Sequence, residues 1–365
     1  MKDGLDEAAL NRLVEAMIVS WPAFDGPRFK RAALTGLDDL ELKDRVRHII
    51  AVLNRFLPGS FPKALKIVVA AGSHFPPGRS GDALAGFAAW PLIDWVPEYG
   101  LDHFDPSMKA LKKLTSLFSA EFAVRPFLLQ DTDRALGHLR GCLNDPDEHV
   151  RRLISEGTRP RLPWGCQLPM FRDDPGPVIG LLTHLRDDPA EYVRRSVANN
   201  LNDIAKDHPA EVVKVCRAWV KGASDQRRWI VRHGLRTLVK QGDKGALKVL
   251  GYTIDPKVEV QLELSAKSLK IGGDLIIEVN LVSTARRTQK LVIDYVVHHL
   301  RAGGKTTPKV FKLRSLDLEP GESVHLQKKH SFAPRTVRRY YPGKHTVELM
   351  VGGRSLGRRS FTLTG

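Results

Sequence analysis

The sequence lacks the features that mark disulfide-rich, zinc-binding and membrane proteins. It has only three cysteines in 365 residues, Cys142, Cys166 and Cys216, and they form no CxxC pair. This spacing excludes a disulfide framework and a cysteine-based zinc site. The longest apolar runs are short, such as residues 67–71, whereas a membrane helix needs about 18 or more apolar residues. The sequence therefore predicts no membrane span and no membrane partner.

Short catalytic motifs are also missing. The chain has no GxxxxGK loop followed by Ser or Thr, no HExxH and no GxSxG. The sequence therefore shows no motif of the common nucleoside triphosphatases, zinc metallopeptidases or serine hydrolases. His298 and His299 fall in a predicted strand, where we interpret them as structural or surface residues. Cys166 has no recognisable histidine partner, which favours a structural role. Residues 1–7 lack the basic-then-apolar pattern of a signal peptide, so we expect a cytoplasmic protein.

Positive charge is abundant. Lysine and arginine number 57 against 41 acidic residues, which gives a formal net charge of +16. Such a chain most often binds a polyanion: a nucleic acid, an anionic membrane surface or an acidic protein. Residues 255–365 hold 20 basic and 10 acidic residues, a net charge of +10. A solubilising surface is one interpretation of this excess, and contact with a polyanion is the one we favour.

The chain divides into two parts with different hydrophobic periodicity. Over residues 1–252, apolar residues recur at helical spacing, as at Leu10, Leu13 and Met17. From residue 256 onward, apolar and polar residues alternate as in half-buried strands. We expect a HEAT-like repeat catalytic domain over 1–252 and an immunoglobulin-like sandwich over 256–365. The seven predicted strands span 257–264, 274–282, 290–300, 309–317, 322–332, 344–351 and 354–363.

An internal repeat supports the solenoid. Residues 149–156, 192–199 and 229–236 align without gaps at offsets of 43 and 37 residues, and residues 121–125 resemble an earlier copy. A period of about 40 residues is typical of HEAT-type helix pairs. Equivalent positions on successive helices lie side by side. The alignment therefore predicts two rows, the first of Arg152, Arg195 and Arg232, and the second of Glu156, Asn199 and Arg236.

Two carboxylates and one loop stand out against this basic surface. Glu156 lies in the second row, and Asp203 lies one helical turn beyond Asn199. The segment 157–177 contains five prolines and carries Trp164, so it reads as a long, stiff and functional loop. Structural interpretations stay open: arginines in such repeats often bind loop carboxylates, and the loop could be a hydrophobic staple between repeats.

Three segments resemble the AlkC branch of the AlkD-like DNA glycosylases, the HEAT-repeat alkylation-repair family. They are residues 119–127, 149–165 and 196–206, and the middle segment is the most specific. The resemblance covers the helical half, and some members of this branch carry a C-terminal immunoglobulin-like domain. It implies excision of cationic N3-alkylated bases, chiefly 3-methyladenine and 3-methylcytosine, from double-stranded DNA without base flipping. It implies no metal, nucleotide or redox cofactor and no obligate protein partner.

On this interpretation, side chains of three kinds share the work. Ionised carboxylates stabilise the positive charge that develops on the deoxyribose and place a water at C1′, an aromatic wall faces the lesion, and basic groups hold the phosphates. The sequence does not decide which carboxylate activates the water. The carboxylates are Glu156 and Asp203, with Glu121 third; the wall is Trp164; and the DNA-binding residues are Arg152, Arg159, Arg161, Arg195, Lys206, Arg232, Arg338 and Arg339.

Two other functions compete with the glycosylase. One is a non-catalytic HEAT-repeat scaffold that binds an acidic peptide, and the other is a protein that recognises damaged DNA without chemistry. Carboxylates inside a basic groove distinguish the enzyme from a scaffold, because they would repel the phosphates of a simple polyanion. Only an activity assay separates the enzyme from the recognition protein.

Overall fold

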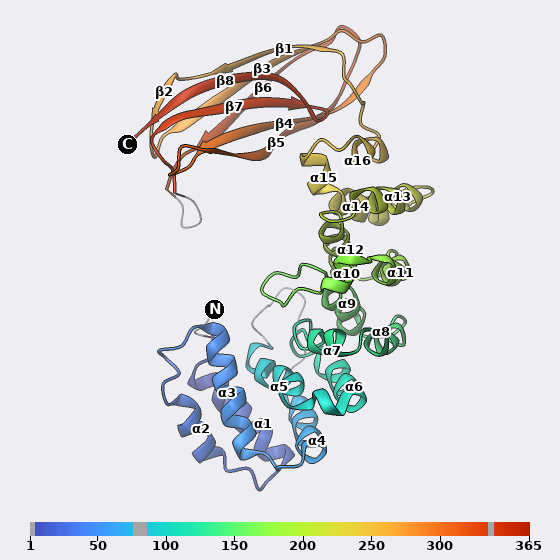
Figure 1. The fold of residues 1–365 in the computed structure, drawn as a ribbon, viewed down its shortest axis with the longest axis vertical. Helices are drawn as coiled ribbons and strands as arrows, with labels where there is room; N and C mark the ends of the chain where they lie inside the picture. The colour runs from blue at the N-terminus through green and yellow to red at the C-terminus, as the bar shows by residue number, and fades with distance from the viewer. Residues whose placement is uncertain (1–3, 76–85, 335–338) are drawn as a thin grey trace. The chain divides into compact units, whose positions relative to one another are not determined.

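The computed structural model describes residues 4–75, 86–334 and 339–365 (Figure 1). Helices occupy the chain as far as Val249, and strands follow from Val258 onward. The fold class predicted from periodicity, a helical-repeat part followed by an all-β part, is therefore confirmed. No helix among these described residues is long and apolar enough to cross a bilayer.

The N-terminal helices begin at residues that can cap them. Asp6 accepts a hydrogen bond of 2.9 Å from the backbone N–H of Ala9, and Asp25 accepts one of 3.1 Å from Arg28. Leu10, Leu13 and Met17 of the first helix are buried, as the helical spacing predicts, whereas Val14 is half-buried and Ile18 is exposed. These helices are α1 (Glu7–Ser20), α2 (Gly26–Leu34), α3 (Leu42–Phe56), α4 (Phe61–Gly72) and α5 (Trp90–Gly100).

The remaining helices carry the aligned repeat segments. Asp147 caps α9 by accepting a hydrogen bond of 2.8 Å from the backbone N–H of His149. Helix α6 begins at Phe104 and holds Pro106 in its first turn, where a missing N–H costs nothing. These helices are α6 (Phe104–Leu114), α7 (Arg125–Gln130), α8 (Thr132–Arg140), α9 (Glu148–Gly157), α10 (Pro169–Asp173), α11 (Gly176–Leu185), α12 (Glu191–Ile204), α13 (Pro209–Trp219), α14 (Asp225–Gly234), α15 (Arg236–Lys240) and α16 (Lys244–Val249).

One arginine on each of α9 and α12 secures a loop between helices. Arg151 forms a two-pronged ion pair with Asp188, at 2.6 and 3.0 Å. Arg194 donates to the backbone carbonyls of Asp188 and Pro189 at 2.6 and 2.7 Å. The sequence analysis left open that arginines of the repeat bind loop residues in this way. The residues that do so are Arg151 and Arg194, each one position before a member of the predicted row. Arg152 and Arg195 therefore make other contacts.

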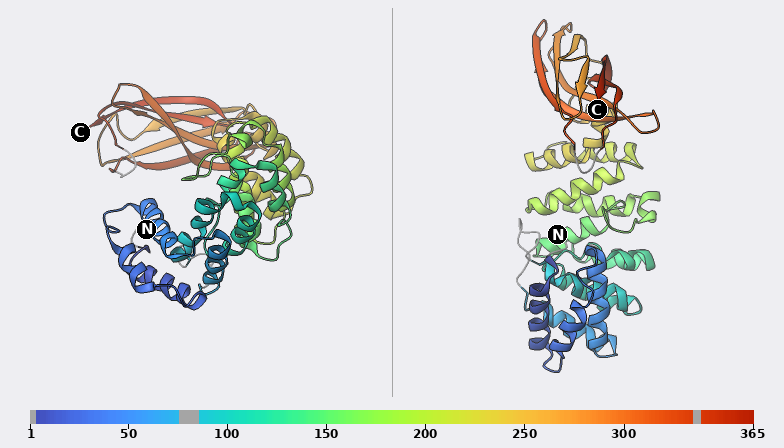
Figure 2. Two further views of the ribbon diagram at one scale, coloured as in Figure 1. Left: turned by 60° about the horizontal axis from the view of Figure 1, so that its bottom comes forward. Right: turned by 90° about the vertical axis from the view of Figure 1, so that its left-hand side faces the viewer.

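The C-terminal part is a sandwich of a three-stranded and a five-stranded sheet, with strand orders β1-β3-β6 and β2-β8-β7-β4-β5 (Figure 2). The seven predicted strands are present, and the structure adds the short β2, which pairs in parallel with β8. Alternate residues of the long strands fill the core, which holds Ile277, Val279, Ile293, Val297 and Phe332. The strands are β1 (Val258–Leu264), β2 (Ser268–Lys270), β3 (Asp274–Ser283), β4 (Gln289–Leu300), β5 (Thr306–Leu318), β6 (Ser323–Ser331), β7 (Gly343–Val351) and β8 (Arg354–Thr364).

The chain forms two compact units, and the boundary between them comes before the change from helices to strands. One unit holds residues 1–208 and 224–230, and the other holds 209–223 and 231–365, so the last helices belong with the sandwich. Within this second unit, Thr253 and Lys290 exchange two hydrogen bonds of 2.8 and 3.0 Å. Gly242 and Gly353 meet so closely that a Cβ on Gly353 would lie 2.5 Å from the Cα of Gly242. The boundary at 252–256 stays a prediction.

Candidate functional site

Six side chains from three segments form a continuous series of opposite charges, which we call the carboxylate–arginine chain: Glu121, Arg152, Glu156, Arg159, Asp203 and Lys206. Three of them are anions and three are cations. Arg152 contacts Glu121 at 2.6 Å and Glu156 at 3.6 Å. Arg159 then donates to Glu156 at 2.6 Å and to Asp203 at 2.8 Å, and Lys206 completes the series at 2.9 Å from Asp203. All three predicted carboxylates are thus brought together.

Two helices and a turn position this chain. Arg152 and Glu156 lie one turn apart on α9, so they project from the same face. Asp203 lies near the end of α12, which packs against α9, and each helix buries a valine, Val150 on α9 and Val197 on α12. Glu121 comes from the turn before α7 and so reaches the chain from a different repeat.

Uncharged groups complete the surroundings of Glu156. The Ser196 hydroxyl donates to its Oε2 at 2.6 Å, and Ser155 donates to Ser196 at 2.7 Å. The Asn200 amide fixes the end of α9 by donating to the Ser155 carbonyl at 2.8 Å. Since Arg159 bonds Oε1, both oxygens of Glu156 are held. A carboxylate restrained in this way keeps one orientation.

Electrostatics keep Glu156 ionised. The side chain is only 7% exposed, and burial alone would raise its pKa. The charges of Arg152 and Arg159, with the hydrogen bonds from Ser196 and Arg159, outweigh burial and lower the pKa of Glu156 below its usual value. An anion is therefore fixed inside the chain at neutral pH.

The segment after α9 is held by a residue that the sequence analysis did not select. The fully buried Arg125 donates to the backbone carbonyls of Gly157, Arg159 and Cys166 at 2.9, 2.9 and 2.7 Å. It thereby ties both ends of the segment to α7. The only local signal was an arginine inside the apolar run 122–128, which had no visible partner. The expected irregular loop 157–177 is also shorter than predicted, because α10 forms within it.

Trp164 is displayed outward from this segment. Its side chain is 62% exposed, and its φ of 68° places the backbone in the left-handed region that non-glycine residues seldom adopt. The ammonium group of Lys43, on α3, donates to the Trp164 carbonyl. An exposed indole on a strained, anchored backbone indicates a contact residue rather than a core residue.

The other predicted DNA-binding residues are not part of one cluster. Arg161 forms two hydrogen bonds with Asp207, at 2.8 and 2.6 Å. Arg195 is exposed and pairs with Glu191 at 2.5 Å, and Arg232 is exposed on α14. Arg339 is exposed with its guanidinium 5.5 Å from the Tyr341 ring. Arg338 lies outside the described residues, and the DNA contacts of all these residues stay predictions.

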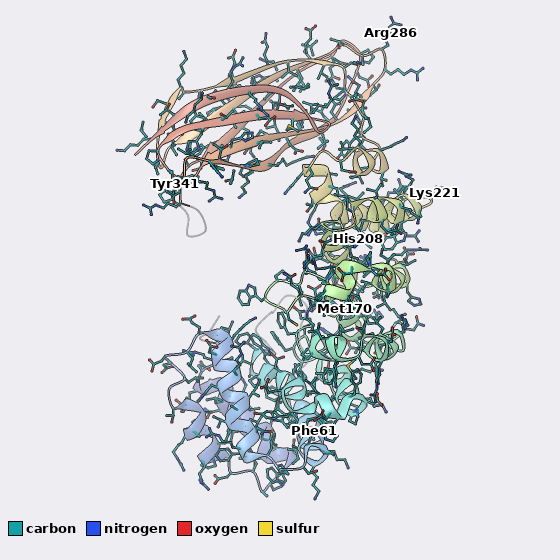
Figure 3. The ribbon with its side chains drawn as sticks, in the orientation of Figure 1. Phe61, Met170, His208, Lys221, Arg286 and Tyr341 are labelled. Carbon is teal, nitrogen blue, oxygen red and sulfur yellow. The ribbon has the colours of Figure 1, made fainter. Side chains whose placement is uncertain are left out.

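Tyr341 lies at one end of the sandwich and Arg286 at the other (Figure 3).

The two adjacent histidines have structural surroundings within the sandwich. His299 is buried beside Phe332, and His298 contacts Glu348 at 2.7 Å. Among the described residues, no group of three or more His, Cys, Asp or Glu side chains is arranged to hold a metal ion.

Comparison with known proteins gives the lineage of the chain. Residues 259–365 match the family model "Uncharacterised protein YhaZ, C-terminal Ig-like domain". The chain is 37% identical over 355 residues to "Uncharacterized protein YhaZ" of Bacillus subtilis (strain 168), covering 97% of this chain and 96% of that protein. It is 36% identical to the solved alkylpurine DNA glycosylase AlkC of Pseudomonas fluorescens, bound to DNA containing an abasic site analog. That match has a TM-score of 0.91 and covers 100% of this chain and 99% of the other. The chain therefore belongs to the AlkC-type family of HEAT-repeat DNA alkylation-repair glycosylases with a C-terminal immunoglobulin-like domain.

Proposed function

We propose that the protein is a DNA glycosylase that hydrolyses the N-glycosidic bond of cationic N3-alkylated bases, chiefly 3-methyladenine and 3-methylcytosine, in duplex DNA. The observation that carries this proposal is the carboxylate–arginine chain, which holds three anions at fixed positions in a basic protein. Family membership gives independent support, since AlkC is an alkylpurine DNA glycosylase. A polyanion-binding scaffold has no use for such anions, because they repel phosphates.

Hydrolysis of the lesion's glycosidic bond requires negative charge near the sugar, which the carboxylate–arginine chain supplies. The bond between C1′ and the methylated base breaks heterolytically, and both electrons stay with the base, so a cationic base leaves neutral. Positive charge then develops on the deoxyribose, and nearby anions stabilise it. Water adds at C1′ and gives its proton to a carboxylate, which leaves an abasic site. No acid has to protonate the leaving base, and no cofactor takes part in this sequence of steps.

The contacts suggest different tasks for the three carboxylates. Glu156 has both oxygens bonded, and Asp203 has both oxygens bonded to Arg159 and Lys206. The Oε2 atom of Glu121 accepts hydrogen bonds from Ser119 and Arg152. Its Oε1 atom accepts no hydrogen bond from the part of the chain that the structure describes. We therefore assign Glu121 to the water at C1′, while Glu156 and Asp203 supply fixed negative charge.

Trp164 is the group that meets the lesion. Its exposed indole can stack on the cationic base or the sugar, and an aromatic face attracts a cation by about 0.5–2 kcal/mol. Because the indole is displayed on the surface, contact does not require the base to turn into a pocket first, and the proposal includes no base flipping. A fluorescent base analogue placed beside the lesion tests this part, because unstacking on binding would contradict it.

The sandwich is proposed to clamp the duplex without reading its sequence. Its net charge of +10 supports this role, and Arg339 is exposed beside Tyr341 at one end. Removal of one phosphate-binding cation should lower the salt slope of DNA binding by about 0.9. Arg339→Gln should show this reduction in an otherwise intact chain. Arg286→Gln, at the opposite end of the sandwich, is a variant of equal charge for comparison. An unchanged slope in both variants would remove the clamp from the proposal.

The decisive experiment is base release from duplex DNA that contains one 3-methylcytosine or one 3-methyladenine. The wild type should release the base, and Glu121→Gln, Glu156→Gln and Asp203→Asn should each slow release by about a hundredfold or more. Duplex binding should persist or tighten, because negative charge has been removed. Glu211→Gln is the matched control, because this carboxylate on α13 is half-exposed and lies outside the carboxylate–arginine chain. Duplex binding with no release of either base would favour the damage-recognition protein instead.

A further inference from the structure

A second feature lies beside the carboxylate–arginine chain and takes no part in it. A cavity of about 510 Å³ opens between α3, α5 and the segment that carries Trp164. Its volume exceeds that of a nucleobase several times over. The wall residues that matter here are Lys43, Trp90, Asp94, Phe122, Trp164 and Cys166.

The cavity combines aromatic surface with hydrogen-bond donors. The Lys43 ammonium lies 5.8 Å from the centre of the Phe122 ring and is anchored on the Trp164 carbonyl. Asp94 accepts a hydrogen bond of 2.7 Å from the Trp90 indole. Burial raises the pKa of Asp94 to about 7, against the opposing effects of Trp90 and Lys43. Near neutral pH this carboxyl is therefore partly protonated, and its protonated form can donate a hydrogen bond.

The cavity and the proposed catalytic carboxylate are neighbours. Phe122 follows Glu121 directly in the chain, and the negative charge of Glu121 contributes to the raised pKa of Asp94. Trp164 lines the cavity and is also the proposed contact residue for the lesion. A base detached next to Glu121 thus has a walled space immediately available.

We propose that this cavity, walled by Phe122 and Trp164 and furnished with the Lys43 ammonium, binds the methylated nucleobase after the glycosidic bond has broken. The inference rests on the proposed function. The change in charge during the reaction explains why the product is favoured: the base is a cation while attached to the sugar and is neutral once released. An ammonium repels the cation but donates readily to the ring nitrogen that gains a lone pair on cleavage. The aromatic walls stack on either form.

The test is binding of free 3-methyladenine to the full-length protein without DNA, followed by tryptophan fluorescence and by calorimetry. We expect saturable binding at one site. We expect Lys43→Met and Phe122→Leu to weaken it about tenfold or more, with Glu211→Gln unchanged. The permanently cationic 3,9-dimethyladeninium should bind at least about tenfold more weakly than 3-methyladenine. Absence of saturable binding, or equal binding by the wild type and both cavity variants, would overturn the inference, as would tighter binding of the cation.

Glu156→Gln separates this inference from the proposed function. It should lose base release but still bind free 3-methyladenine, because Glu156 does not line the cavity. Release by the wild type without binding of the free base overturns the cavity inference alone. Binding without any release overturns the proposed function, and the ligand can then no longer be a product of this protein.

Discussion

The guanidinium of Arg125 is hydrogen-bonded to the backbone carbonyl of Cys166, 41 residues further along the chain. The same side chain also holds the carbonyls of Gly157 and Arg159. It therefore acts on the site through the backbone, by fixing where Arg159 and Trp164 lie. If the proposed function is correct, excision should therefore depend on Arg125, which belongs to α7 and contributes no atom to the carboxylate–arginine chain.

Arg125→Met should consequently impair both stability and excision. It leaves three carbonyls without a donor, two of them buried, so we expect a loss of about 3 kcal/mol in the free energy of unfolding. Urea unfolding at pH 7 measures this loss. Single-turnover excision should fall well below wild type even under conditions where the variant is fully folded. Arg125→Lys keeps one donor and should recover part of the stability, whereas identical unfolding curves for all three proteins would show that the carbonyls are solvated instead.

Trp164→Leu should separate activity from stability. The indole is 62% exposed, so its loss should change the free energy of unfolding by less than about 0.5 kcal/mol. Excision should fall about tenfold or more, because the aromatic contact with the lesion is removed. Thermal unfolding and single-turnover excision on the same preparation give both values. Trp164→Phe keeps an aromatic face and should be intermediate; equal excision by the Leu and Phe variants would count against stacking.

Glu156 makes stability depend on pH in the acid range. Its folded pKa is lowered from the ordinary 4.5, so its ionised form contributes stability that is complete above that value. The contribution is lost as pH falls through the folded pKa. The gap in urea midpoint between the wild type and Glu156→Gln should therefore be wide and constant at pH 6–8 and should narrow below about pH 4. A gap that stays constant down to acid unfolding would mean that the charge of Glu156 contributes nothing.

Asp94 should show the opposite dependence. Its folded pKa is raised from 3.8 to about 7, so the folded protein holds a proton that the unfolded chain releases. Stability is therefore lost as pH rises between these values. Asp94→Asn still accepts the Trp90 hydrogen bond and does not titrate. Its melting temperature relative to wild type should rise by at least about 2 °C between pH 5 and pH 8. A difference that does not change with pH would show that Asp94 is ionised throughout.

Periodicity was sufficient for the architecture because it is a local signal. Strict alternation over 257–264 predicted a strand, and β1 forms there. The short β2 escaped prediction because three residues, paired only at a sheet edge, carry no alternation long enough to detect. Contacts over long separations were equally invisible for the site. Spacing on a helix placed Arg152 near Glu156, but nothing local pairs Arg152 with Glu121.

Lys43 and Asp94 were not predicted as site residues for the same reason, because their shared surroundings depend on contacts between distant parts of the sequence. Each lies on an ordinary amphipathic helix, and only the folding of α3 and α5 against the Trp164 segment gives them a shared cavity. Their residue types carried no motif. The repeat alignment pointed to Arg152 and Glu156 because they lie at equivalent positions of successive repeats, whereas no repeat position marks Lys43 or Asp94.

The close approach of Gly242 and Gly353 has a practical meaning for anyone who wishes to shorten or recombine this protein. Two backbones meet there with no room for a side chain, each at a positive φ. Cutting the chain at residue 252 would separate α15 and α16 from the sandwich and expose the contact surface on both fragments. A C-terminal piece that begins near Pro209 would carry α13 to α16 together with the sandwich and keep this contact intact.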